Sequence, residues 1–258
     1  MWSAEPPGLF AFYFLVLSSS ATGFSIPCSS LFTSLSQMLL KITYYLDVIS
    51  SWCHWSEPAW ALLKTRYGGS TEFQWKIALM DSTGLPKSRS QLEWFYRRSG
   101  TIMAADHTIR SDWYDPKLGE YLAPNLVAEA ATDLGVGRDD DRVRIAIAEA
   151  GLLQGRPTSL LSEAVAIAVG VAPELDPTSL NQRASSPEIE QRIRATTAEF
   201  HALQVTQRPT YLLENRIGDR VVFSGVAKPG PLIATVGQML ADAKAQQEYD
   251  ESHEPIPN

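Results

Sequence analysis

The chain has 258 residues, of which 45% are hydrophobic and 20% charged, and this suits one large domain or a core fold that carries an insertion. A formal net charge of -7 without clustered Lys and Arg argues against general binding to nucleic acid or to an anionic membrane surface. Two cysteines, Cys28 and Cys53, make no disulfide framework, and the scattered histidines lack zinc-site spacing, so no metal site is predicted.

Residues 1–40 differ from the rest and are predicted to be an N-terminal extension or a signal-like segment. Their apolar run Leu9–Leu17 is too short for a membrane-spanning helix, which takes about 20 residues, so no integral membrane span is expected. We favour translation from Met38, which predicts a cytoplasmic protein. The alternative is export, with residues 1–21 acting as a signal peptide cleaved near Ala21, although the usual positive start is missing.

A reactive cysteine is predicted where the first strand meets the first helix. Ile42–Val48 is β-branched and aromatic enough for a buried strand, and Pro58 suggests that a helix starts near Glu57. Unpaired amides and the dipole at a helix N-terminus favour an anion, so Cys53 would ionise with a pKa below the usual value of about 8.5. A protonated His54 would act in the same direction. The alternative for Cys53 is a small buried apolar residue.

The middle of the chain changes from strand to helix. Thr71–Met80 is predicted to be a second strand, which completes a right-handed βαβ unit. Residues 86–205 contain no convincing strand and are too many for a loop, so we expect a helical domain inserted between two halves of a sheet fold. The segments with apolar residues at helical spacing are Gln91–Ser99, Asn125–Leu134, Arg142–Leu153, Leu160–Val171 and Pro187–Gln204.

The C-terminal part returns to strands and ends in a helix. Pro209–Glu214 and Arg220–Ser224 are predicted to form an antiparallel hairpin with Gly218 in its turn. Leu232–Gln246 is expected to be an amphipathic helix. Residues 249–258 are acidic and contain proline, so they are predicted to be a disordered tail.

The stretch YYLDVISSWCHWSEPAW resembles the active-site segment of the DsbA-like family of the thioredoxin superfamily, in which a first strand ends in a C-x-x-C motif at a helix start. Here the motif is Cys53-His54-Trp55-Ser56, a C-x-x-S variant. The resemblance implies an α/β fold class. Residues 41–85 and 206–248 would form the thioredoxin fold (βαβ…ββα), and residues 86–205 an inserted all-helical domain.

The resemblance also implies a cis-proline beside the active cysteine, and the matching residue is Pro209. A cis bond would let the Arg208 backbone pair with an extended thiol substrate such as glutathione. The Arg208 side chain would stabilise a thiolate or hold a substrate carboxylate, the alternative being a solvent-exposed guanidinium. The candidate substrate-binding residues are Trp52, Trp55, Arg208, Pro209 and Thr210.

Because Ser56 cannot resolve a mixed disulfide, release must come from an external thiol. We therefore expect a thiol-disulfide oxidoreductase with Cys53 as nucleophile and His54 lowering its pKa. Glutathione or protein thiols would be its partners, and no tightly bound cofactor is expected. Ser56 would donate a hydrogen bond to the Cys53 sulfur or cap the helix.

Two alternatives stay open. The chain resembles kappa-class glutathione transferases and 2-hydroxychromene-2-carboxylate isomerases in architecture, but these families usually carry serine where Cys53 stands. The mechanism that this resemblance implies is activation of bound glutathione by the protein. Alternatively, Trp52, Trp55 and Trp60 form an aromatic surface that binds peptides without catalysis, although tryptophans of this kind are more often core residues.

Overall fold

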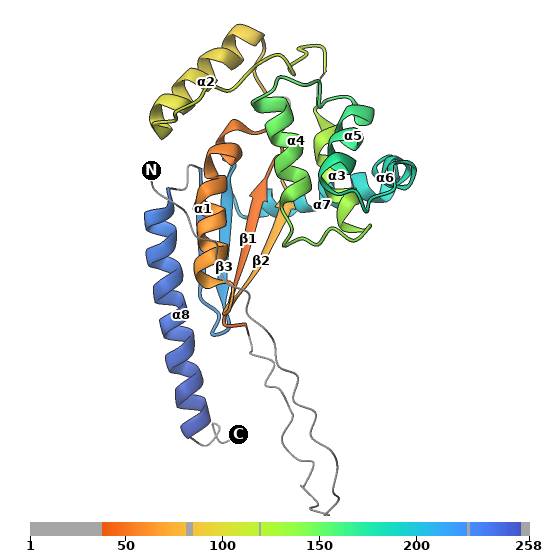
Figure 1. Ribbon diagram of the computed structural model, residues 1–258. Coiled ribbons are helices and arrows are strands. Elements are labelled where there is room, and N and C mark those ends of the chain that lie inside the picture. Colours follow the sequence, from red (N-terminus) through yellow and green to blue (C-terminus); the bar gives the residue numbers. More distant parts are fainter. Residues whose placement is uncertain (1–37, 81–84, 119, 226–227, 254–258) are drawn as a thin grey trace, which may run out of the picture. The chain divides into compact units, whose positions relative to one another are not determined.

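The computed structural model describes residues 38–80, 85–118, 120–225 and 228–253, in which helices cover a mixed sheet (Figure 1). The strands are β1 (Leu40–Leu46), β2 (Thr71–Ile77), β3 (Thr210–Asn215) and β4 (Arg220–Ser224). They lie in the order β2-β1-β3-β4. β1 runs parallel to β2, whereas β3 is antiparallel to both β1 and β4. A parallel pair needs a crossover between its strands, and the first helix provides it.

Helices pack on both faces of the sheet, because successive β1 side chains point to opposite sides. Tyr44 contacts Trp60 of α1 (Ser51–Tyr67), with ring centroids 5.0 Å apart. On the opposite face Tyr45 contacts Phe200, with ring centroids 6.0 Å apart. Helix α8 (Pro229–Ser252) lies along α1 (Figure 1) and packs its apolar side against α1, β1 and β3.

Between β2 and β3 the described residues are helical, as predicted from their periodicity. Helices α3 to α6 pack on one another, with small alanine side chains at their contacts. Helix α2 lies apart from them, close to the N-terminal end of α1 (Figure 1). The helices are α2 (Arg89–Met103), α3 (Leu122–Thr132), α4 (Arg142–Leu152), α5 (Leu161–Val171), α6 (Pro177–Ala184) and α7 (Pro187–Ala202). This confirms the predicted thioredoxin fold with inserted helices, while the exact domain bounds stay predictions.

Two helix ends differ from the sequence predictions. Helix α1 begins at Ser51, not near Glu57, because Ser50 caps it, and Pro58 lies inside the helix. Helix α8 continues to Ser252, into the region predicted to be disordered. Contacts at i,i+4 spacing support this extension: Lys244 with Glu248, Gln246 with Asp250, and Gln247 with Glu251.

Some predictions concern residues outside the described ranges, namely the signal-like run, the cleavage site near Ala21, Cys28 and the last five residues of the predicted tail. In the part of the chain that is described, no helix has the length and apolar character needed to cross a bilayer.

Candidate functional site

The N-terminus of α1 presents unpaired hydrogen-bond donors. Ser50 adopts an extended backbone, and its hydroxyl accepts a hydrogen bond from the Cys53 amide at 3.4 Å. Within the described residues, the amides of Ser51 and Trp52 have no acceptor. Such orphan amides, together with the positive end of the helix dipole, favour a bound anion.

A cavity lies directly beside these donors. We call it the proline groove, because one wall is the segment leading to Pro209, whose peptide bond with Arg208 is cis as predicted. Its volume is about 290 Å³. The described residues that line it are Ile49, Ser50, Ser51, Trp52, Met80, Leu85, Pro86, Leu92, Phe95, Tyr96, Arg98, Trp113, Thr206, Gln207 and Arg208.

Arg208 anchors the wall of the groove to the end of β2. Its Nε donates to the Ala78 carbonyl at 2.5 Å, and its Nη2 donates to the Leu79 carbonyl. The guanidinium also stacks over Phe200, 4.5 Å from the ring centroid. Arg208 is therefore a positioning residue in this structure, and a contact from it to substrate stays a prediction.

Cys53 is buried and differs from the predicted reactive thiol. It is 3% exposed and lies outside the proline groove, lining instead a cavity on the other side of α1. Burial raises the pKa of Cys53 to about 12, and the Asp47 and Glu57 carboxylates act in the same direction. Hydrogen bonds from Ser50 and from the Asp47 backbone oppose this shift without overcoming it. The expectation of a lowered thiol pKa is thus wrong.

His54 does not supply the positive charge expected of it. Burial, and then the neighbouring His107, lower the pKa of His54 to about 4, so the ring is neutral near pH 7. Its Nε2 lies 3.2 Å from Nε2 of His107, away from the groove.

Ser56 lies inside α1, one turn beyond Cys53. Its hydroxyl is 2.7 Å from the Tyr211 hydroxyl of β3, so Ser56 faces the sheet and does not cap the helix. Thr210 is also directed inward, since its Oγ1 donates to the Gln207 carbonyl at 2.7 Å.

The predicted tryptophans point to different places. Trp52 lines the proline groove, whereas the Trp55 indole donates to Ser99 of α2 at 3.0 Å and lines the cavity on the other side of α1. Trp60 is buried in the core, so it does not belong to the aromatic surface considered as an alternative.

Because α1 starts at Ser51, the two cysteine positions of a C-x-x-C motif at this helix start lie three residues earlier than Cys53 and Ser56, where the sequence analysis placed them. A C-x-x-C pair at this helix start would occupy Ser50 and Cys53, so Ser50 stands where the groove-facing thiol would be. Sequence reasoning missed Ser50, although a serine three residues before Cys53 and after a buried strand was a usable signal. It also missed Phe95, Tyr96 and Trp113, which reach the groove only through tertiary packing.

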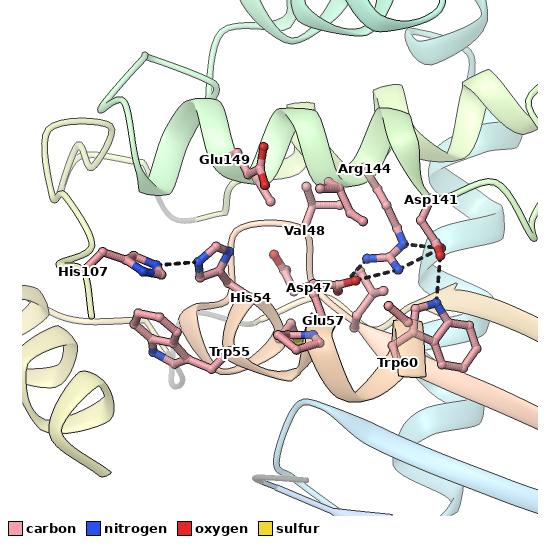
Figure 2. Close-up of a pocket in the computed structure, with 16 residues that line it drawn as sticks. Asp47, Val48, His54, Trp55, Glu57, Trp60, His107, Asp141, Arg144 and Glu149 are labelled. Carbon is pink, nitrogen blue, oxygen red and sulfur yellow. Dashed lines mark hydrogen bonds and ion pairs between the residues drawn. The ribbon is translucent and has the colours of Figure 1, made fainter. Parts of the chain in front are cut away.

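We call the cavity on the other side of α1 the α1–α4 cavity; its volume is about 360 Å³ (Figure 2). Arg144 of α4, 3% exposed, binds Glu57 of α1 at 2.6 and 2.9 Å. It also binds Asp141, which accepts the Trp60 indole N–H at 2.9 Å. Tyr44 completes the network by donating to Glu57 at 3.1 Å. The charges here are paired and join the thioredoxin part to the inserted helices.

Comparison with known proteins shows likeness in solved structures only. No protein-family model and no curated protein sequence matches the chain. A putative protein disulfide isomerase from Nitrosomonas europaea is 16% identical with a TM-score of 0.62, covering 81% of this chain and 98% of its own. The cytosolic disulfide reductase DsbM from Pseudomonas aeruginosa is 16% identical with a TM-score of 0.58, covering 81% and 99%.

A 2-hydroxychromene-2-carboxylate isomerase is 15% identical with a TM-score of 0.55, covering 83% of this chain and 100% of its own. At such identities the likeness concerns the fold. The chain therefore has the DsbA-like thioredoxin fold with an inserted set of helices.

Proposed function

We propose that the protein is a thiol-disulfide oxidoreductase that binds glutathione, or another small thiol, in the proline groove. The bound thiol, and not Cys53, is the nucleophile. The observation that carries this proposal is the pair of amides of Ser51 and Trp52, unpaired within the described residues, beside the Ser50 hydroxyl, in three residues that line one cavity. A thiolate placed there would be stabilised, and its pKa lowered, by these donors.

Ser50 is suited to donate to such a sulfur. Its oxygen accepts the Cys53 amide, and its one proton, which is directed to the Cys53 sulfur in this structure, would turn to the sulfur of the bound thiol. The pKa of Cys53 is about 12, so near neutral pH this residue keeps its proton and does not compete with the bound thiol as the attacking thiolate.

The groove also offers a positive charge to a ligand. The Arg98 guanidinium at the same cavity would suit one of the carboxylates of glutathione.

The proposed reaction exchanges one disulfide for another. The bound thiolate attacks one sulfur of a substrate disulfide, a new sulfur–sulfur bond forms, and the other substrate sulfur leaves as a thiolate that takes up a proton. A second external thiol then attacks the sulfur of the first thiol in this mixed disulfide, so that the two thiols form a disulfide and the remaining half of the substrate leaves as a thiol. Ser50 cannot provide that second thiol.

One structural neighbour, DsbM, supports this assignment. DsbM is described as a disulfide reductase, and its structure with GSH has a TM-score of 0.57 to this chain at 15% identity. DsbM is also described as cytosolic, which supports a cytoplasmic location if translation starts at Met38. Mass spectrometry of the natural N-terminus tests that location, and a mature chain starting near Thr22 would contradict it.

The decisive experiment measures glutathione-dependent reduction of hydroxyethyl disulfide. We expect S50A to lose about 10²-fold in kcat/KM, as when one donor to a developing anion is removed. C53A should stay within about twofold of the native rate, since a thiol with a pKa of about 12 takes no part. S90A, which changes an exposed serine on α2, is the matched control. Full activity in S50A, or its loss in a folded C53A protein, would contradict the proposal.

A second candidate follows from serine replacing the groove-facing thiol. In this alternative, the same groove activates glutathione for addition or isomerisation. The isomerase among the similar structures is the reason to test it. Conjugation of glutathione to chlorodinitrobenzene, with no reduction of hydroxyethyl disulfide, would favour it over exchange.

A further inference from the structure

Two histidines from distant parts of the sequence meet at the edge of the α1–α4 cavity. His54 lies on α1, and His107, 53 residues later, follows α2. Their Nε2 atoms are 3.2 Å apart, with ring planes 82° to each other. Figure 2 shows the two rings pointing toward each other.

The distance of 3.2 Å between the two Nε2 atoms matches that between two nitrogen ligands of one tetrahedral metal ion. Zinc–nitrogen bonds of about 2.0–2.1 Å at a tetrahedral angle place the two nitrogens about 3.3 Å apart. A direct hydrogen bond between the rings uses the same two nitrogens, and a metal ion would replace it.

A carboxylate orients the second histidine for this role. Asp106 Oδ1 lies 2.8 Å from Nδ1 of His107, which therefore carries its proton on Nδ1 and turns the Nε2 lone pair toward His54. Metal-binding histidines typically have such a carboxylate on their other nitrogen. The site is also reachable, because the His107 side chain is 44% exposed.

We propose that His54 and His107 bind a divalent transition-metal ion, with zinc fitting the pair best. In the described part of the chain no group of three or more His, Cys, Asp or Glu side chains could hold a metal, so water completes the coordination. The ion would tie the first turns of α1 to the segment after α2. The inference does not depend on the proposed function, because neither histidine lines the proline groove. Spacing in the sequence could not reveal this pair.

The test is calorimetric titration of zinc chloride into the full-length chain after chelation and dialysis. We expect one ion per chain. H54Q and H107Q should each weaken binding at least tenfold, and D106N by about tenfold through loss of the orienting carboxylate. H201Q, which changes an exposed histidine at the end of α7, should bind as the native chain does.

Circular dichroism of each variant shows whether it is folded, and S50A, which changes a groove residue that contacts neither histidine, should bind zinc normally if the helix cap is not needed to hold His54. No stoichiometric binding to the native chain would overturn the proposal, as would unchanged affinity in folded H107Q. Cobalt provides a second readout. Its near-ultraviolet spectrum should lack a thiolate charge-transfer band, whereas such a band would place the metal on a cysteine and overturn the site.

Discussion

The proline groove and the α1–α4 cavity lie on two sides of the same turn of α1 and differ in how their polar groups are satisfied. The groove exposes donors without acceptors, at Ser51 and Trp52. The cavity contains charges that pair with one another, around Arg144. Unpaired groups can bind a ligand, whereas paired groups fix the structure. The comparison therefore assigns binding to the groove and stability to the ion network, and each assignment can be tested.

The largest effect should come from restoring a thiol pair. In a Cys28→Ser background, S50C is expected to form a disulfide with Cys53 on mild oxidation, because the two positions are the cap and third residue of α1. The matched variant S56C, which completes the motif as first assigned from sequence, should stay reduced, since Ser56 faces Tyr211. Mass spectrometry after blocking free thiols measures both. Oxidation of S56C but not S50C would reverse our placement of the motif.

The next effect concerns alkylation of Cys53, again with Cys28→Ser. At pH 8 a thiol with a pKa of about 12 contains roughly a thousandfold less thiolate than an ordinary cysteine, so iodoacetamide should react about a thousandfold more slowly. The rate should rise about tenfold per pH unit, and a plateau below pH 9 would contradict this.

The raised pKa of Cys53 also affects stability. Above about pH 8.5 the unfolded thiol ionises while the folded one keeps its proton, so the free energy of unfolding should fall as pH rises toward about 12. Comparing native and C53A proteins by urea unfolding across this range isolates the contribution. The variant should decline less, because it keeps the share of buried tyrosines such as Tyr44 and Tyr211, whose pKa values burial also raises, and lacks that of Cys53.

Breaking the ion network should destabilise the fold strongly. R144M leaves Glu57 and Asp141 without their buried partner, so we expect a loss of about 3–5 kcal/mol in the free energy of unfolding in urea. R194M removes an exposed arginine that pairs with Glu120 and Glu190, and should cost less than about 1 kcal/mol. Equal losses in the two variants would contradict the stabilising role assigned to the network around Arg144.

The smallest effect should come from the anchor of the groove wall. R208K keeps the charge but loses the fork that binds the carbonyls of Ala78 and Leu79, so we expect a stability loss of about 1 kcal/mol. If the wall binds substrate, the KM for glutathione should rise severalfold while kcat changes little. An unchanged KM would limit Arg208 to a structural role.

The fold was largely predictable from sequence, because strand and helix periodicities are local and the order of elements matched a known arrangement. The cis bond at Pro209 followed from the same resemblance. The start of α1 was misplaced because Pro58 resembles a first helical residue, although Ser50 is the actual cap. Helix starts depend on such competing caps.

The electrostatics of the site were not predictable, because desolvation depends on the whole fold. A cysteine near a helix start has a low pKa only if its sulfur is accessible, and burial reversed the expected shift of Cys53. Burial also lowers the pKa of His54, so this residue is not the protonated neighbour that was expected. One wall of the groove comes from α2 and the segment after it, and another from residues 206–208, and no local pattern connects either of them to α1.

The hydroxyl of Ser50 in place of a second sulfur has a chemical consequence for the whole molecule. Within the described residues there is no dithiol to oxidise, so this part of the chain has no reduction potential of its own and cannot store an electron pair between turnovers. Its turnover would instead follow the concentration of free thiol around it.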